Sequence, residues 1–128
     1  MSDREPVNKA DAERHAVISK ALQLLSVFRD MNADMPMGEA VSLLLVAQGE
    51  SPDGRGLTVT ELSLQGDFGL SSASRYMKSL GKKDRHGRPG EEVVSDARDP
   101  ADERRKVLRL TTKGMSVIGR IQSVFREA

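Results

Sequence analysis

The amino-acid sequence predicts one mainly α-helical domain with a small antiparallel β-hairpin, arranged as a winged helix-turn-helix with long helical arms. Three observations support this. Apolar residues recur at steps of three and four over residues 11–31, 37–48 and 113–126, which indicates amphipathic helices. Residues 59–80 contain two short helical patterns around a glycine-bearing turn, and a predicted hairpin follows them. The 128 residues, 38% of them hydrophobic, suffice for a single core.

The first two helices have recognisable boundaries. Asn8 or Asp11 is expected to cap the first helix, and the stretch MNADMP ends it. Pro36 is expected in the first turn of the second helix, which covers about residues 37–48, and Gly49 is expected just after its end. The apolar residues of this second helix extend almost all round, so we expect it to be central and buried.

Two short helices then read as a helix-turn-helix. Thr58 and Glu61 match a capping box, which predicts a helix from residue 59 to about residue 65. Ser71 is expected to cap the second short helix, residues 72–80. Three apolar residues share one face of that helix and are predicted to be core: Ala73, Met77 and Leu80.

The last third of the chain predicts a β-hairpin and a closing helix. Residues 91–95 are expected to form the first strand, residues 96–102 the tip and residues 106–110 the returning strand. Thr111 or Thr112 is expected to cap the last helix.

Positive charge is concentrated in two segments of a nearly neutral chain. Residues 75–90 carry six Lys and Arg against one Asp, a net charge of +5, and residues 98–113 carry six against three, a net charge of +3. The whole chain has a net charge of +1. Such a zone is typical of a polyanion-binding face, although charge runs are often only solvated surface. Residues 82–90, rich in glycine, proline and basic residues, are expected to form a flexible loop.

The motif Asp102-Glu103-Arg104, followed by Leu110-Thr111-Thr112-Lys113-Gly114, resembles the wing signature of MarR-type transcription regulators, D-x-R and then L-T-x-x-G. The order of the predicted elements agrees with that family over nearly the whole chain. Two departures from the family pattern suggest either that the recognition helix is re-aimed or that the chain belongs to a divergent branch, for example from a mobile element. The stretch around Gly66 and Asp67 is longer than the family's usual link between its two DNA-reading helices, and residues 82–90 are longer and more basic than usual.

The resemblance implies a homodimer whose two winged lobes grip one DNA duplex. It implies a single domain over residues 1–128, with residues 11–31 and 112–127 as dimerisation helices and residues 37–110 as the winged helix-turn-helix lobe.

In such folds the N-terminal residues of the recognition helix face base edges in the major groove. Ser71, Ser72, Arg75 and Tyr76 are therefore expected to contact bases, and Lys78 to contact phosphate. Two of these have alternative roles: Ser71 as a helix cap only, and Tyr76 as a partly buried aromatic.

The wing and the basic loop complete the predicted DNA-binding set. Arg98, near the hairpin tip, is expected to reach the adjacent minor groove. The resemblance implies that Asp102 and Arg104 brace the wing through an ion pair and that Arg104 also faces DNA. The remaining residues expected to contact DNA are Lys82, Lys83, Arg85, Arg88 and Arg105.

The sequence argues against several other classes of protein. It has no cysteine, which excludes disulfides and thiolate zinc sites. Its histidines, His15 and His86, are far apart, and no nucleophile motif is present, so we expect no metal site, no cofactor and no enzyme. The few aromatic residues give a small-molecule effector no support. The longest apolar run has five residues and the N-terminus is polar, which predicts a cytoplasmic, nucleoid-associated protein without membrane contact.

The sequence thus predicts a sequence-specific double-stranded DNA-binding transcription regulator, a repressor that acts as a homodimer on a pseudo-palindromic site. Two alternatives remain. One is an architectural DNA-binding protein of low sequence specificity, which depends on the basic loop. The other is a winged-helix module for protein interaction, which would need an exposed apolar patch.

Overall fold

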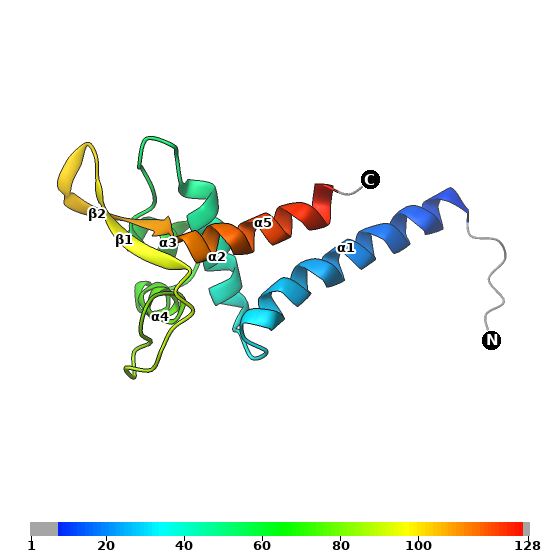
Figure 1. The fold of residues 1–128 in the computed structure, drawn as a ribbon, viewed down its shortest axis with the longest axis horizontal. Coiled ribbons are helices and arrows are strands. Elements are labelled where there is room, and N and C mark those ends of the chain that lie inside the picture. Colours follow the sequence, from blue (N-terminus) through cyan, green and yellow to red (C-terminus); the bar gives the residue numbers. More distant parts are fainter. Residues whose placement is uncertain (1–7, 127–128) are drawn as a thin grey trace.

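The structure, a computed structural model, describes residues 8–126. Two helical arms extend from one side of a compact winged lobe (Figure 1). The elements follow the predicted order: α1 (Lys9–Met31), α2 (Met37–Gly49), α3 (Val59–Gly66), α4 (Leu70–Leu80), β1 (Val94–Asp99), β2 (Asp102–Leu110) and α5 (Thr112–Arg126). The predicted fold class, mainly α with a two-stranded antiparallel wing, is confirmed.

Helices α1 and α2 agree with the prediction except at two of their ends. Asn8 caps α1, since its Oδ1 accepts a hydrogen bond of 2.8 Å from the Asp11 amide. Pro36 is the N-cap of α2 rather than a residue of its first turn. Gly49 is the last residue of α2, not the residue after it. A Cβ atom at Gly49 would lie 2.6 Å from Cγ of Leu57, so close packing accounts for this glycine.

Helix α2 forms the centre of the lobe, as its apolar pattern predicts. Leu43 and Val46 are completely buried, and α2 contacts α3, α4 and β2. The large apolar side chains that have no exposed surface come from every layer of the lobe: Leu43, Val46, Leu62, Leu80, Val93 and Val107. This shared core holds the two short helices and the wing in fixed relative positions.

The helix-turn-helix begins with the predicted capping box. Thr58 Oγ1 accepts from the Glu61 amide at 3.1 Å, and Glu61 Oε1 accepts from the Thr58 amide at 2.9 Å. Asp67 is the C-cap of α3 and has a left-handed backbone with a φ of 57°. The expected long link was wrong because α3 continues through Gly66 and leaves a turn of ordinary length, residues 67–69. Ser71 does not cap α4, because that helix begins one residue before it, with Gly69 as N-cap.

The wing differs most from the prediction. The expected strand over residues 91–95 was wrong because Glu92 has a φ of 59°, a left-handed conformation that interrupts an extended strand. Strand β1 instead runs to Asp99 and pairs with β2 from Val94 opposite Leu110 to Asp99 opposite Asp102. The tip is therefore only residues 100–101, not 96–102, and the returning strand begins before residue 106.

A short bridge and the last helix complete the lobe. Leu57 adds a bridge to the wing, since the Leu108 amide donates to its carbonyl at 2.7 Å. Thr111 caps the closing helix, because its Oγ1 accepts from the Gly114 amide at 3.0 Å. Helices α1 and α5 lie side by side, and Lys20 Nζ donates to the Val124 carbonyl at 2.8 Å. Within residues 8–126, none of the helices combines the length and the apolar character that crossing a membrane requires.

Candidate nucleic-acid interface

Helix α4 is held by one face and presents the other to solvent. Ala73, Met77 and Leu80 are buried in the core, as their spacing predicts. The opposite face carries four exposed polar or basic side chains, spaced so that they line up along the helix: Ser71, Ser74, Arg75 and Lys78. The sequence analysis did not select Ser74, although it stands three residues after Ser71 and therefore on the same face. Four adjacent hydrogen-bond donors on one exposed helical face suit contact with base edges and phosphates.

The other two residues predicted on α4 are half-buried, Ser72 and Tyr76. The Tyr76 ring packs edge-on against Phe68, with centroids 5.3 Å apart and an angle of 84° between the planes. Its hydroxyl would lie 2.5 Å from a Cβ atom at Gly38, so the ring fills the space between α4 and α2. The Arg75 guanidinium lies 5.6 Å from the centre of the Tyr76 ring. Tyr76 thus packs between α4 and α2, and its ring also interacts with the Arg75 guanidinium.

The wing is fixed to the helix-turn-helix by one arginine between two carboxylates. Arg105 Nη1 lies 2.6 Å from Asp99 Oδ2, and Arg105 Nη2 lies 2.6 Å from Glu61 Oε1. The Asp99 side chain is only 7% exposed. Because Glu61 also belongs to the capping box with Thr58, this network joins the tip of the wing to the start of α3.

The same network shifts the ionisation of its members. A hydrogen bond from the Ala101 amide, helped by Arg105, holds the pKa of Asp99 below its usual range. The Thr58 amide, and then the charge of Arg105, lower the pKa of Glu61 in the same way. Both carboxylates are therefore charged at neutral pH and keep the Arg105 guanidinium in place.

The Asp102–Arg104 pair, expected to brace the wing, forms at the surface. Arg104 Nε lies 3.3 Å from Asp102 Oδ1, and the Arg104 side chain is 93% exposed. A pair this exposed contributes little to stability, about 0–1 kcal/mol. The Asp99–Arg105–Glu61 network, which the sequence analysis missed, is the stronger brace. Arg105, predicted to contact DNA, has its guanidinium turned to this network, whereas Arg104 remains available.

Arg98 is exposed near the tip and its Nη1 donates to the Glu103 carbonyl at 2.9 Å. This bond holds the Arg98 side chain across the hairpin without using its other donors. The base of the wing is anchored separately by Arg109, which donates to the Ser51 and Arg55 carbonyls at 2.9 and 2.7 Å. The wing is thus attached at both ends and presents Arg98 and Arg104 on a fixed support.

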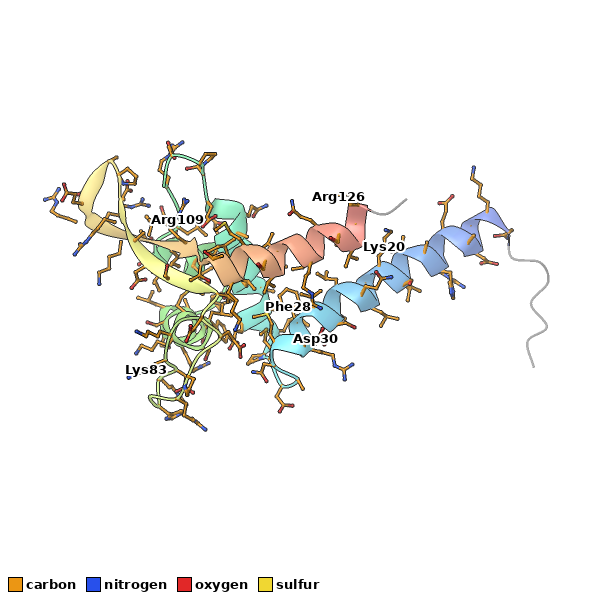
Figure 2. All side chains as sticks on the ribbon, in the orientation of Figure 1. Lys20, Phe28, Asp30, Lys83, Arg109 and Arg126 are labelled. Atoms are coloured by element: carbon orange, nitrogen blue, oxygen red, sulfur yellow. The ribbon has the colours of Figure 1, made fainter. Side chains whose placement is uncertain are left out.

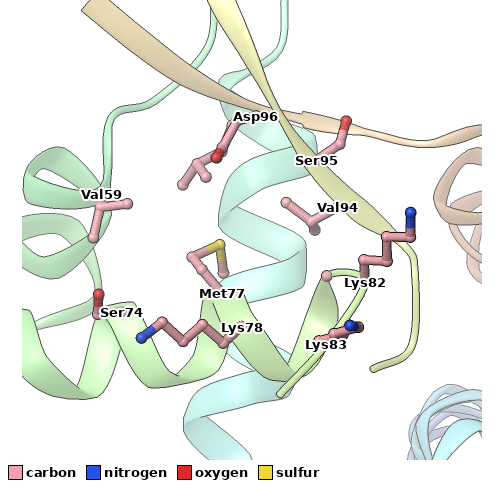
Figure 3. A pocket seen from close by; sticks show the side chains of 11 residues that line it. Val59, Ser74, Met77, Lys78, Lys82, Lys83, Val94, Ser95 and Asp96 are labelled. Atoms are coloured by element: carbon pink, nitrogen blue, oxygen red, sulfur yellow. The ribbon is translucent and has the colours of Figure 1, made fainter. Parts of the chain in front are cut away.

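A groove of about 410 Å³ separates α4 from the wing (Figure 3). Lys78 of α4 and Lys82 and Lys83 of the following segment line it, together with Ser95 and Asp96 of β1. Met77 and Val94 are also in its lining. Three lysines against one aspartate make a cationic groove that suits a phosphate chain.

Residues 82–90 form no helix or named strand, as predicted, yet they are not an open loop. Lys83 and Pro89 form an antiparallel bridge, and the Asp84 amide donates to the Arg88 carbonyl at 2.7 Å. We call this segment the 82–90 hairpin. Its four Lys and Arg side chains are all exposed, as a phosphate-contacting role requires: Lys82, Lys83, Arg85 and Arg88.

These features gather at one end of the molecule. Helix α4, the 82–90 hairpin and the wing lie at the end opposite to the start of α1 and the end of α5 (Figure 1). Lys83 marks this end in Figure 2, whereas Lys20 and Arg126 lie along the helical arms. The structure therefore brings together, from α4, the hairpin and the wing, the residues that the sequence analysis had selected.

Comparisons with known proteins find the same fold. No protein-family model and no curated protein sequence matches this chain. Among solved structures, the S. aureus MepR–DNA complex matches with a TM-score of 0.59 and 21% identity, over 89% of this chain and 79% of that chain. S. aureus MepR bound to ethidium bromide matches with a TM-score of 0.65 and 17% identity, over 92% and 75%. RV1404 from Mycobacterium tuberculosis matches with a TM-score of 0.63 and 15% identity, over 98% and 78%.

These structures superpose on nearly the whole chain although the sequences differ, so the comparison shows that the fold is shared. In this chain the architecture consists of five helices, with a two-stranded wing between the fourth and the fifth. This chain therefore has the winged-helix fold of MarR-type regulators.

Proposed function

We propose that this protein is a transcription regulator that binds double-stranded DNA as a homodimer and represses by occupying a pseudo-palindromic site. The observation that carries the proposal is the position of the exposed face of α4. Its residues Ser71, Arg75 and Lys78 lie beside a lysine-lined groove and at the same end of the molecule as the wing. A helix with a cationic wing beside it fits the major groove of a duplex and the backbone next to it.

Each side chain has a distinct task in this proposal. Arg75 can donate two hydrogen bonds to the acceptors of one guanine, which is worth about 1–3 kcal/mol of discrimination. Ser71 and Ser74 donate to bases or phosphates nearby, and Lys78 neutralises a phosphate. Arg98, near the tip of the wing, enters the adjacent minor groove, where its charge responds to groove width rather than to base identity, and Arg104 also faces the DNA.

A solved relative in fold supports the choice of partner. The structure of S. aureus MepR in complex with DNA matches this chain with a TM-score of 0.59 over 89% of its length.

The homodimer is supported by the helical arms. Large apolar side chains on α1 and α5 are exposed in the single chain: Val17 (66%), Ile18 (52%), Leu22 (61%), Met115 (55%) and Phe125 (56%). Such a patch on an extended arm is typical of an interface between chains. We expect a solution mass of twice the chain's 14.0 kDa. Two recognition helices related by a two-fold axis would then read half-sites about one helical turn apart.

The test is selection of duplexes by the purified protein, followed by measurement of affinity for the enriched site and for unrelated DNA. Arg75→Ala should weaken binding to the enriched site by about 10- to 100-fold and should hardly affect binding to unrelated DNA. Arg14→Ala on α1 removes the same charge far from α4 and serves as the control. If Arg75→Ala binds the enriched site as tightly as the unchanged protein, α4 is not the reading element.

The alternative, architectural binding of low specificity, is favoured by the net charge of +5 on residues 75–90. It predicts affinity that falls steeply with salt and is independent of sequence. Competition at physiological salt separates the two functions. If unrelated DNA displaces the enriched duplex as effectively as the enriched duplex itself does, the architectural function replaces the regulator.

A further inference from the structure

The 82–90 hairpin is a folded projection. Asp84 Oδ1 accepts hydrogen bonds from the His86 amide at 2.8 Å and from the Arg88 amide at 2.9 Å. The Gly87 amide donates to the Asp84 carbonyl at 3.0 Å, and Gly87 has a φ of +79°, a backbone conformation that favours glycine. Four of the nine residues thus take part in one turn: Asp84, His86, Gly87 and Arg88.

The hairpin is attached rigidly to the end of α4. The Glu91 amide donates to the Ser79 carbonyl at 2.9 Å, and the Val93 amide donates to the Leu80 carbonyl at 2.8 Å. These bonds satisfy carbonyl groups that the end of a helix leaves without partners. A Cβ atom at Gly90 would lie 2.2 Å from the Gly81 carbonyl oxygen, so the chain entering the hairpin and the chain leaving it are closely packed at its base. The hairpin therefore moves with α4.

Asp84 is an unexpected residue to find in a phosphate-binding segment. Its carboxylate weakens the attraction of its basic neighbours for DNA, and it also pairs with Arg88 at 3.5 Å. Hydrogen bonds from the Arg88 and His86 amides lower the pKa of Asp84, so the carboxylate stays charged. A flexible loop that acts only through its charge would gain from losing this residue. A folded arm needs it, because fixing the arm before binding reduces the entropy lost on binding.

At the base of the 82–90 hairpin, Lys82 and Lys83 line the groove between α4 and the wing, but the far end of the hairpin projects from α4 away from the wing (Figure 1). When α4 occupies a major groove, the two phosphate backbones border it on either side. We propose that the 82–90 hairpin is a second, preorganised arm that contacts the DNA backbone on the side of α4 opposite to the wing. This inference rests on the proposed function, since it takes duplex DNA as the partner, and it makes Asp84 a positioning residue for the cationic side chains of the arm.

Two substitutions at Asp84 distinguish the effect of the folded turn on DNA affinity from the effect of the negative charge. Asp84→Asn and Asp84→Ala both remove one negative charge, but only asparagine keeps an oxygen that can accept the two amide hydrogen bonds. Affinity for duplex DNA is measured by fluorescence anisotropy with the full chain. We expect Asp84→Asn to bind about two- to threefold more tightly than the unchanged protein, because it gains net positive charge near the phosphates. We expect Asp84→Ala to bind about fivefold more weakly than Asp84→Asn, because the turn is lost.

Asp96 provides the matched control. It is exposed on the wing beside the groove, and its side chain supports no turn. Asp96→Asn and Asp96→Ala should therefore strengthen binding equally. Thermal unfolding of the Asp84 variants verifies that the lobe stays folded, as expected for a change in a solvent-exposed turn.

A second measurement addresses the arm without changing its turn. Arg85→Gln should reduce the slope of log affinity against log salt by about 0.9, the value of one phosphate contact. Arg14→Gln on α1 should leave the slope unchanged. Equal tightening by both Asp84 variants, or an unchanged slope for Arg85→Gln, would overturn the second arm while leaving the proposed function intact. Failure of the unchanged protein to bind any duplex at low salt would overturn both.

Discussion

Replacing Glu39 by glutamine is expected to stabilise the protein above neutral pH. Glu39 lies in the first turn of α2, is only 4% exposed, and has a side-chain hydrogen bond with Ser79 at the end of α4. Burial, followed by the negative charge of Glu91, raises the pKa of Glu39 from 4.5 to about 7. Glutamine has the same shape and can keep a hydrogen bond with Ser79, but it carries no charge to desolvate.

The sign of the effect follows from proton binding. Between about pH 4.5 and about pH 7 the folded protein holds a proton on Glu39 that the unfolded chain has released. The free energy of unfolding of the wild type therefore falls as the pH rises through this window and then levels off. Each pKa unit corresponds to about 1.4 kcal/mol, so the full effect is about 3 kcal/mol. The helix dipole at the start of α2 stabilises the charged form of Glu39 by about 0.3–1 kcal/mol, an interaction that glutamine loses. The expected net gain in the free energy of unfolding of Glu39→Gln is therefore about 2–3 kcal/mol.

Urea unfolding of the wild type and Glu39→Gln, measured from about pH 4 to about pH 8, tests this expectation. The two proteins should have similar free energies of unfolding near pH 4, and the variant should be more stable by about 2–3 kcal/mol near pH 8. Glu91→Gln should shift the decline of the wild type to lower pH, and Glu13→Gln on α1 should not change it. A difference between wild type and Glu39→Gln that is constant across the pH range, or a less stable variant near pH 8, would refute the reasoning.

Two further predictions concern the wing and the closing helix. Gly114→Ala should destabilise the protein by about 3 kcal/mol in urea unfolding, because the new Cβ would lie 2.1 Å from the backbone oxygen of Val93. Gly119→Ala on the same helix meets no atom within 4 Å and should stabilise by about 0.5–1 kcal/mol, so equal effects at the two glycines would contradict the packing. Arg105→Ala should lower the free energy of unfolding because it removes the cation between Asp99 and Glu61, and an unchanged free energy of unfolding would show that the brace is unimportant.

Features that depend on neighbours in the chain could be predicted from the sequence. The periodicity of α2 and the capping box at Thr58 and Glu61 are local, and both are confirmed. Errors of one or two residues arose at helix ends, where the boundary depends on packing as well as on local capping patterns. Gly49 is an example: packing against Leu57, rather than a special backbone angle, requires it, and no local pattern reveals that contact.

Features that depend on distant residues could not be predicted in this way. The strands of the wing are rich in charged residues, which a two-stranded ribbon tolerates because much of its surface is in water. Glu61 and Arg105 are 44 residues apart, so their ion pair has no local signal. Arg104 and Arg105 look alike in the sequence. Only their contacts in the folded chain distinguish them, since Arg105 lies between Asp99 and Glu61, whereas Arg104 is 93% exposed.

The absence of cysteine from the sequence permits a direct test of the DNA-binding face. Single cysteines at exposed positions of α4 (Ser74→Cys), the wing tip (Ala101→Cys) and the far end of α1 (Ala12→Cys) can each carry an iron chelate that cuts nearby DNA. We predict cutting inside each half-site from α4, cutting at the flank of the half-site from the wing, and none from α1. Cutting from α1 with none from α4, in proteins that still bind the duplex, would contradict the account.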